Sequence, residues 1–433
     1  MNFEKFLSVG EDNFIKTYGK VSKVVGLTVE ATTGPDVKVN DTCRILVSGT
    51  GNEILCEVIG FRDDRIILMP YEDVNGIKTG DLVESLNESY KIPAGPELLG
   101  RVLNGIGKPM DGLPAPKTTD TCESENMPPS PMERVLIDQE LSLGVRAVDG
   151  MLTLGKGQRI GIFAGSGVGK STLLGMFARN TKADINVIAL IGERGREVKE
   201  FMERDLGEEG LKRSVVVCAT SDQPALLRKK AAKTATAIAE YFRDQGKDVL
   251  LMMDSLTRFS MAQREIGLAS GEPPVSRGYP PSVYAEMPKL LERAGKTAKG
   301  SITGIYTVLV DGDDFNEPIT DTARGILDGH IMLSRKLAHK NHYPAIDVLQ
   351  SISRVMSSIA SPEHKKAANE LKNVLATYND AEDLINIGAY KAGSNKEIDR
   401  AIEKIDDINA FLCQETMENV SFNETVERLE GLF

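Results

Sequence analysis

One glycine-rich stretch of the sequence has the composition of a phosphate-binding loop: Arg159-Ile-Gly-Ile-Phe-Ala-Gly-Ser-Gly-Val-Gly-Lys-Ser-Thr. Glycines have no Cβ, so the backbone can curl and direct successive N–H groups at a phosphate chain. Lys170 can then reach the β- and γ-phosphates of a nucleotide, and the Ser171 hydroxyl can ligate Mg²⁺. The stretch matches G-x-x-x-x-G-K-[ST] with one departure, since Ala164 stands where the first glycine belongs. We predict a loop that binds ATP or ADP through Gly165, Ser166, Gly167, Val168, Gly169, Lys170, Ser171 and Thr172.

Two acidic residues follow apolar runs elsewhere in the chain. Asp254 closes the run Asp-Val-Leu-Leu-Met-Met-Asp, and in a P-loop fold such a carboxylate holds Mg²⁺ through water. Glu193 follows the run Ile185–Ile191, where the end of a strand faces the ligand crevice of an open α/β sheet. We predict that Glu193 orients and deprotonates the attacking water and that Arg194 contacts the γ-phosphate. The alternative for this segment is a solvated charged loop with internal ion pairs.

Several apolar runs without strict alternation lie around these residues, a pattern typical of parallel strands buried on both faces. Helical patterns at Pro224–Arg243 and Ser282–Ala294 lie between them. We therefore predict an α/β fold class with a P-loop domain built on a parallel sheet. The predicted strands are Ile160–Ala164, Ile185–Ile191, Ser214–Ala219, Val249–Met253, Ile302–Val310 and His330–Leu333.

Different patterns flank this central part. Short β-branched runs separated by Gly, Asp and Asn turns predict an N-terminal β-barrel domain over residues 18–90. Residues 91–360 form the predicted ATPase domain, which includes a connecting segment at 91–132 rich in proline and glycine. Residues 361–433 read as helices only, and residues 1–17 form a separate N-terminal arm. The barrel runs are Lys20–Ala31, Thr42–Val47, Ile54–Phe61, Arg65–Met69 and Leu82–Glu84, and the C-terminal helical runs are Pro362–Thr377, Ala381–Ile387, Lys396–Leu412 and Asn423–Leu432.

Composition narrows the class of protein. The chain has 433 residues, enough for two or three domains. We find neither a run of ~18 apolar residues nor the basic and apolar regions of a signal peptide, and the five scattered cysteines suggest reduced thiols. These features predict a cytosolic protein. A net charge of −11 argues against a broad nucleic-acid footprint.

Four stretches resemble those of a known family: Gly165-Ser-Gly-Val-Gly-Lys-Ser, Gly192-Glu-Arg-Gly-Arg-Glu, Met253-Asp-Ser-Leu-Thr-Arg-Phe and Tyr343-Pro-Ala-Ile-Asp-Val-Leu-Gln-Ser-Ile-Ser-Arg-Val. Together they resemble the rotary ATP synthase catalytic-subunit superfamily. Within it, two further stretches are similar to the ATPase of flagellar and type III protein export. These are Ala269-Ser-Gly-Glu-Pro-Pro-Val-Ser-Arg-Gly-Tyr-Pro-Pro-Ser-Val, and Gly304 to Arg335. The likeness covers nearly the whole chain.

The resemblance implies a role for individual residues of the phosphate site. Lys170 corresponds to the Walker lysine, Ser171 to the Mg²⁺ ligand and Asp254 to the Walker-B aspartate. Glu193 corresponds to the catalytic glutamate, and Arg194 to a γ-phosphate contact.

The resemblance also implies residues outside the phosphate loop. Arg354 falls at the arginine-finger position, which reaches a neighbour's γ-phosphate; a plain interface salt bridge is the alternative. Tyr343 matches the tyrosine that stacks on adenine; a core tyrosine before a proline is the alternative. Phe411 resembles the second adenine contact of the synthase, although Thr416 stands where the synthase has another aromatic.

As a whole, the resemblance implies that the central domain is a RecA-like P-loop domain. It also implies a homohexameric ring with ATP and Mg²⁺ at subunit interfaces. Hydrolysis by this ring would energise protein export through a flagellar or type III secretion apparatus. The expected partners are further copies of the chain, chaperone–substrate complexes and a membrane export gate. Residues 1–17 place apolar side chains at roughly helical spacing, so they are expected to bind a coiled-coil regulator or stator; a fraying terminal helix is the alternative. The expected location is the cytoplasm, peripheral at the inner face of the bacterial cytoplasmic membrane.

Three other functions stay open. The catalytic subunit of a proton-driven ATP synthase would use the same chemistry in a hetero-hexamer. A nucleic-acid translocating motor finds its best support in Arg228-Lys-Lys-Ala-Ala-Lys, although we expect no nucleic-acid partner because such a helix face is usually just solvated. A regulatory nucleotide-binding subunit without turnover is disfavoured by Glu193.

Overall fold

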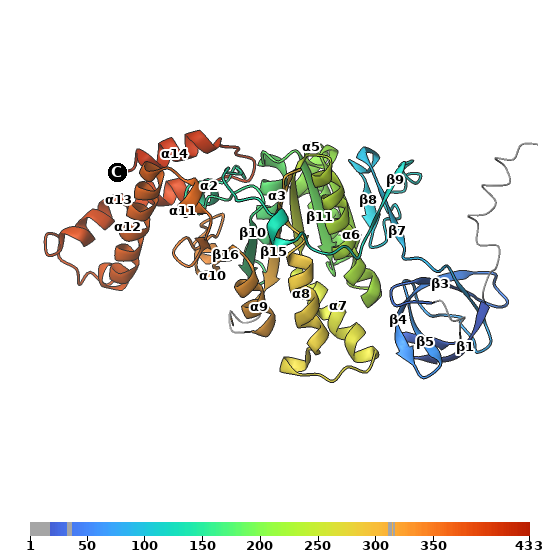
Figure 1. Ribbon diagram of the computed structural model, residues 1–433. Coiled ribbons are helices and arrows are strands. Elements are labelled where there is room, and N and C mark those ends of the chain that lie inside the picture. Colours follow the sequence, from blue (N-terminus) through green and yellow to red (C-terminus); the bar gives the residue numbers. More distant parts are fainter. Residues whose placement is uncertain (1–17, 33–36, 311–313, 315–316) are drawn as a thin grey trace, which may run out of the picture.

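A computed structural model describes residues 18–32, 37–310, 314 and 317–433, so the predicted N-terminal arm lies outside the described residues. The barrel, the α/β part and the C-terminal helices follow one another along the molecule, with the α/β part between the other two (Figure 1). This arrangement confirms the predicted fold class.

The N-terminal part is a closed β-barrel whose strands follow the order β1-β2-β5-β4-β3-β6. Val29, Ile45 and Leu68 pack together in its core with no exposed surface. The predicted run Lys20–Ala31 is two strands rather than one, because a turn at Gly26 breaks it with φ 55°, a value that suits a residue without a Cβ. The barrel strands are β1 (Tyr18–Val25), β2 (Thr28–Ala31), β3 (Thr42–Leu46), β4 (Glu53–Arg62), β5 (Arg65–Pro70) and β6 (Leu82–Ser85).

The central sheet has the order β17-β16-β10-β15-β13-β11-β12-β8 within the described residues, and β14 pairs with β15 beside this path. Neighbours from β16 to β8 run parallel, whereas β14 and β17 pair antiparallel. All the predicted apolar runs form strands of this sheet. Strand β8 was not predicted, because three residues inside a segment rich in proline and glycine carry no readable period. The strands are β8 (Val102–Asn104), β10 (Arg159–Ala164), β11 (Ile185–Ile191), β12 (Ser214–Ala219), β13 (Asp248–Asp254), β14 (Gly295–Lys296), β15 (Ser301–Leu309), β16 (Gly329–Leu333) and β17 (Ile352–Ser353), and β7 (Lys91–Ala94) pairs separately with β9 (Asp120–Glu123).

Helices cover both faces of the sheet (Figure 1). Because side chains alternate along a strand, Leu250 and Met252 of β13 pack in one core with Phe177 of α3. Leu251 packs in the other core with Ile238 of α6. The helices of this part are α2 (Arg146–Asp149), α3 (Lys170–Asn180), α4 (Gly195–Glu200), α5 (Gly207–Lys212), α6 (Ala225–Asp244), α7 (Leu256–Ala269), α8 (Pro281–Leu291), α9 (Pro318–Ile326), α10 (Arg335–His339) and α11 (Met356–Ile359), with a π-helix at Phe201–Leu206 and 3-10 turns at Pro96–Leu98, Pro131–Glu133 and Ser276–Gly278.

The C-terminal part consists of α12 (Pro362–Asn386), α13 (Lys396–Leu412) and α14 (Phe422–Glu430). Two helices were expected where α12 is one, because polar residues interrupt the pattern after Thr377. Tyr378 nevertheless packs against the core, and this tertiary contact stabilises a continuous helix past Thr377. Across the described residues, no helix combines the length and the apolar character that crossing a membrane requires.

The basic stretch on α6 lies at the contact with the barrel rather than on an open face. Lys230 Nζ lies 2.5 Å from Glu57 Oε2 of β4 and 2.8 Å from Glu125 Oε1. Lys233 Nζ lies 2.5 Å from Glu125 Oε2, and Arg228 forms an ion pair with α7. The Lys230 side chain is only 5% exposed. These ion pairs remove the sequence feature that favoured a nucleic-acid motor.

Candidate nucleotide-binding and catalytic site

The glycine-rich stretch forms a loop between the end of β10 and the start of α3. Gly167 has φ 77° and Gly169 has φ 88°, values that residues with a Cβ rarely adopt. A Cβ on Gly165 would lie 2.6 Å from Arg335 Nη2, so any larger residue there would displace the Arg335 side chain. Ala164 pairs with Leu309 inside the regular sheet, which explains why alanine fits where the motif has its first glycine.

The two predicted acids lie beside the lysine of this loop. Lys170 Nζ is 2.5 Å from Asp254 Oδ1 and 3.7 Å from Glu193 Oε1. Strands β11 and β13 are neighbours in parallel register, with Leu190 opposite Asp254, so both acids come to the same sheet edge. The structure therefore brings these three predicted residues together.

The protonation of this cluster departs from that of ordinary side chains. Burial raises the pKa of Glu193 to about 7, and the negative charge of Asp254 adds to the effect. Burial alone would lower the pKa of Lys170, but the charges of Asp254 and Glu193 outweigh it and raise the pKa. Lys170 is thus a cation, and Glu193 can take up or release a proton near neutral pH.

Arg194, the residue after Glu193, points away from this cluster. Its side chain is 80% exposed, and its Nη1 lies 3.4 Å from Glu197 Oε1 on α4. Arg196 and Glu200 form a second surface pair at 2.8 Å. Each of the two interpretations of this segment therefore describes part of it. Glu193 points into the cluster, whereas Arg194 belongs to a solvated loop with internal ion pairs. In a single chain, Arg194 lies on the surface, and its contact with the γ-phosphate stays a prediction.

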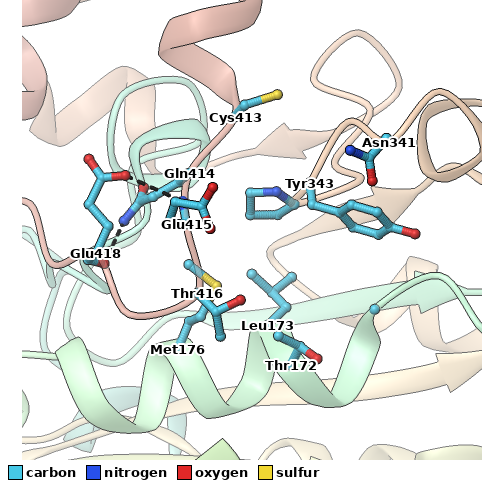
Figure 2. A pocket seen from close by; sticks show the side chains of 12 residues that line it. Thr172, Leu173, Met176, Asn341, Tyr343, Cys413, Gln414, Glu415, Thr416 and Glu418 are labelled. Atoms are coloured by element: carbon cyan, nitrogen blue, oxygen red, sulfur yellow. Dashed lines mark hydrogen bonds between the residues drawn. The ribbon is translucent and has the colours of Figure 1, made fainter.

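A cavity of about 520 Å³ opens beside the loop, between α3 and the C-terminal helices. Figure 2 shows Tyr343 on one side, Glu415 and Thr416 on another, and Thr172 and Met176 of α3 below. The Tyr343 side of the cavity is open, since the residue is 41% exposed. Its ring carbons lie 3.6 Å from the point where a Cβ of Gly169 would be, so the ring reaches the phosphate loop. These positions suit a planar base on Tyr343 with its phosphates on the loop.

Phe411 requires a correction, because the structure places it in the core and not on this cavity. It is 5% exposed, and its ring lies against Gly150 of the central domain. The cavity wall expected from Phe411 is made instead by the segment 413–418 that follows α13. Thr416, noted in the sequence as a departure from an aromatic, belongs to that wall, so this side of the cavity is polar.

Sequence reasoning missed the residues that hold this wall in place. The Gln414 N–H donates to the Tyr343 carbonyl at 2.9 Å, and Gln414 Oε1 accepts from the Arg146 N–H at 2.8 Å. The buried Arg146 side chain donates to the Phe411 carbonyl at 2.9 Å and forms an ion pair with Glu418. The available signal was a basic residue inside the otherwise apolar stretch Val-Arg-Ala-Val, which needs partners when it is buried.

Arg354 lies far from this cluster within one chain. It is exposed, and its N–H donates to the Asp328 carbonyl at 3.0 Å. The Asp328 N–H in turn donates to the carbonyl of Arg159, the first residue of β10. The phosphate loop starts at the other end of that strand, after Ala164, and a strand of this length spans about 16 Å or more. Arg354 therefore lies near the opposite edge of the sheet from Lys170.

A glycine-rich loop with its lysine paired to two strand-end acids, beside a cavity for a base, defines a P-loop nucleotide-binding protein. Comparison with known families agrees and is more specific. Residues 144–353 match the nucleotide-binding domain of the ATP synthase alpha/beta family, and residues 21–87 match its beta-barrel domain. Residues 360–431 match the T3SS EscN ATPase C-terminal domain.

Individual relatives match over nearly their full length. The flagellum-specific ATP synthase of Bacillus subtilis is 57% identical over 96% of this chain and 95% of its own. The type 3 secretion system ATPase of Xanthomonas euvesicatoria is 53% identical over 96% and 94%. The assembled ATPase EscN of the enteropathogenic E. coli type III secretion system superposes with a TM-score of 0.90 at 50% identity, covering 96% of this chain and 99% of that one. EscN in complex with its central stalk EscO gives 0.89 at 49% identity, with the same coverage. The chain belongs to the ATP synthase alpha/beta family, close to its flagellar and type III secretion members, and is an ATPase.

Proposed function

We propose that this chain hydrolyses ATP at the interfaces of a homohexameric ring and so energises protein export through a flagellar or type III secretion apparatus. The observation that carries the proposal is the buried contact of Lys170 with Asp254 and Glu193 beside the Tyr343 cavity. It occurs in a chain about half identical to export ATPases along its whole length.

The donor set fits Mg²⁺. The carboxylate of Asp254 and the hydroxyl of Ser171, next to Lys170 at the start of α3, are the oxygen ligands that this cation prefers. Mg²⁺ held by these residues would neutralise the negative charge that develops on the phosphates.

The remaining chemistry belongs to the side chains. Lys170 turns from Asp254 to the β- and γ-phosphates of ATP, and Tyr343 holds the adenine. Glu193, with its pKa raised to about 7, takes the proton of the water that attacks the γ-phosphate. ADP leaves as the bond between the β-phosphate oxygen and the γ-phosphorus breaks.

The ring follows from the position of Arg354. An exposed arginine at the opposite sheet edge from Lys170 serves its own chain's phosphate poorly, but head-to-tail packing brings that edge to a neighbour. There the guanidinium stabilises the transition-state charge. Arg194, exposed at the loop, is available to the γ-phosphate after a change of rotamer.

The proposed partners follow from the relatives. EscN is seen assembled and in complex with its central stalk EscO, and we assign this chain a stalk partner of the same kind. Chaperone–substrate complexes, an export gate and a coiled-coil regulator or stator bound by residues 1–17 complete the proposal, with the ring at the inner face of the cytoplasmic membrane. The match of residues 360–431 to an export-ATPase domain favours export over the ATP synthase alternative.

The test pairs Glu193→Gln with a control from the adjoining helix α4, Glu200→Gln, whose side chain is 44% exposed and forms an ion pair with Arg196. The purified chain alone should form rings and hydrolyse ATP. Glu193→Gln should bind Mg·ATP like the parent yet hydrolyse it about 10²–10⁴-fold more slowly, the span for a positioned base. Glu200→Gln should stay near the parent. Glu193→Gln activity within about threefold of the parent would remove Glu193 from this role, and a need for a second subunit type would favour the synthase.

A further inference from the structure

Thr307 is a polar residue in an apolar strand. It lies in β15 within Ile-Tyr-Thr-Val-Leu-Val and has no exposed surface. Strands β13 and β15 run parallel with Met253 opposite Tyr306, so the next residues, Asp254 and Thr307, are level with each other. A hydroxyl buried this deeply needs a hydrogen-bond partner.

That partner is the carboxylate assigned to the metal. Thr307 Oγ1 lies 2.7 Å from Asp254 Oδ1 and 3.4 Å from the Met253 carbonyl oxygen. A hydroxyl carries one proton, and the shorter contact to a charged acceptor is the stronger bond, at a length typical of O–H···O⁻ pairs. Thr307 therefore donates to Asp254.

Lys170 contacts the same carboxylate oxygen. Its Nζ is 2.5 Å from Asp254 Oδ1, so one oxygen receives both the ammonium and the hydroxyl. The two partners differ in mobility, because Thr307 is fixed in the middle of the sheet whereas Lys170 ends a flexible side chain. When Lys170 turns to the phosphates of a nucleotide, the hydroxyl is the contact that stays.

We propose that Thr307 is a positioning residue for Asp254. Its hydrogen bond to Oδ1 keeps the carboxylate oriented toward Mg²⁺ when the Lys170 side chain has turned to the phosphates. This inference rests on the proposed function. It assigns no contact between Thr307 and the nucleotide. The Thr307 hydroxyl should therefore affect the nucleotide affinity measured with Mg²⁺ more than the affinity measured without it.

The experiment replaces the hydroxyl by a methyl group of the same shape, Thr307→Val, and restores it in Thr307→Ser. ADP affinity is measured by titration calorimetry twice, with Mg²⁺ and with EDTA. In Thr307→Val, affinity in EDTA should stay within about twofold of the parent, while the gain on adding Mg²⁺ should shrink about tenfold, the effect of losing a hydrogen bond to a charged group. Thr307→Ser should recover most of that gain.

Thr303→Val is the matched control. Thr303 is a buried threonine on the same strand whose hydroxyl accepts from the Gly157 N–H at 2.8 Å, away from Asp254. It should leave the ratio of the two affinities unchanged. An undiminished Mg²⁺ effect in Thr307→Val, or an equal loss of affinity with and without Mg²⁺, would overturn the proposal. Because both arms measure binding, a failure of the parent to hydrolyse ATP would contradict the proposed function without changing this result.

Discussion

Glu193 and Asp254 both lie near Lys170, but they differ in their distance from it and in their other contacts, and we propose different roles for them. Asp254 is 2.5 Å from Lys170 Nζ and also accepts from Thr307. Glu193 lies farther away, at 3.7 Å, and burial raises its pKa to about 7. Asp254 is therefore placed to hold a cation, whereas Glu193 is set to exchange a proton.

This assignment predicts a pH dependence. A base works in its deprotonated form, and a pKa raised to about 7 means that this form accumulates as pH rises through 7. With Mg²⁺ in excess, kcat/KM for ATP should therefore rise between about pH 6 and pH 8 and then level off, because kcat/KM reports groups of the free enzyme. Steady-state rates of the parent measure this, with the residual rate of Glu193→Gln as the control that should lack the rise. A profile flat across this range would show that Glu193 is not the base.

Tyr343 can be tested by fluorescence, because the chain contains no tryptophan. Tyr343→Trp places one indole on the open side of the cavity, and a stacked adenine should quench or shift its emission as ADP binds. Tyr18→Trp is the control, since Tyr18 of the barrel has a similar exposure, 47% against 41%. An unchanged Tyr343→Trp spectrum at saturating ADP, with binding confirmed separately, would exclude the base from this ring.

At the scale of elements, the α6 ion pairs fasten the barrel to the ATPase domain. Lys230 bridges Glu57 of β4 and Glu125, and Tyr71 donates to Glu57 at 2.8 Å. Removing the lysine would leave Glu57, 4% exposed, without its cation. Breaking a buried pair in this way costs about 3–5 kcal/mol.

Lys230→Met should therefore lower the thermal midpoint of unfolding by roughly 5 °C or more. Lys212→Met is the matched control, because Lys212 forms a surface pair with Glu209 and is 69% exposed; it should change the midpoint by roughly 1 °C or less. Differential scanning calorimetry measures both. Equal midpoints for the two variants would mean that the buried pairs do not stabilise this contact.

The sequence pattern predicts helices and strands well, but it does not predict which residues contact each other in the folded chain. The strands that hold Glu193 and Asp254 were readable because continuous apolar runs indicate a buried parallel sheet, and Gly-Lys-Ser marks the loop between strand and helix. Phe411 was misplaced because its neighbours in sequence say nothing about Gly150, against which it packs. The links among Arg146, Gln414 and Tyr343 were invisible for the same reason, since they join residues more than 50 positions apart.

Across the whole molecule, a single chain does not bring all the proposed site residues together. Lys170, Glu193 and Asp254 gather at one edge of the sheet, whereas Arg354 is held through Asp328 at the other. Exposed apolar residues also lie along the segment between β9 and β10, with Met132 at 93% and Leu136 at 87% exposure. Both features are expected of a chain that assembles with further copies of itself.

The most direct test of this account is the specific ATPase activity of the unmutated chain as a function of its concentration. If Arg354 of one subunit completes the site of the next, activity per chain should be low for monomers and rise until rings form, following assembly measured by light scattering. An arginine finger contributes roughly 10³–10⁵ in rate, so the rise should be large. Arg354→Ala should assemble and bind ATP but stay near the monomer rate at every concentration. A specific activity that is the same well below and well above the assembly threshold would contradict the account, because it would mean that one chain contains the whole site.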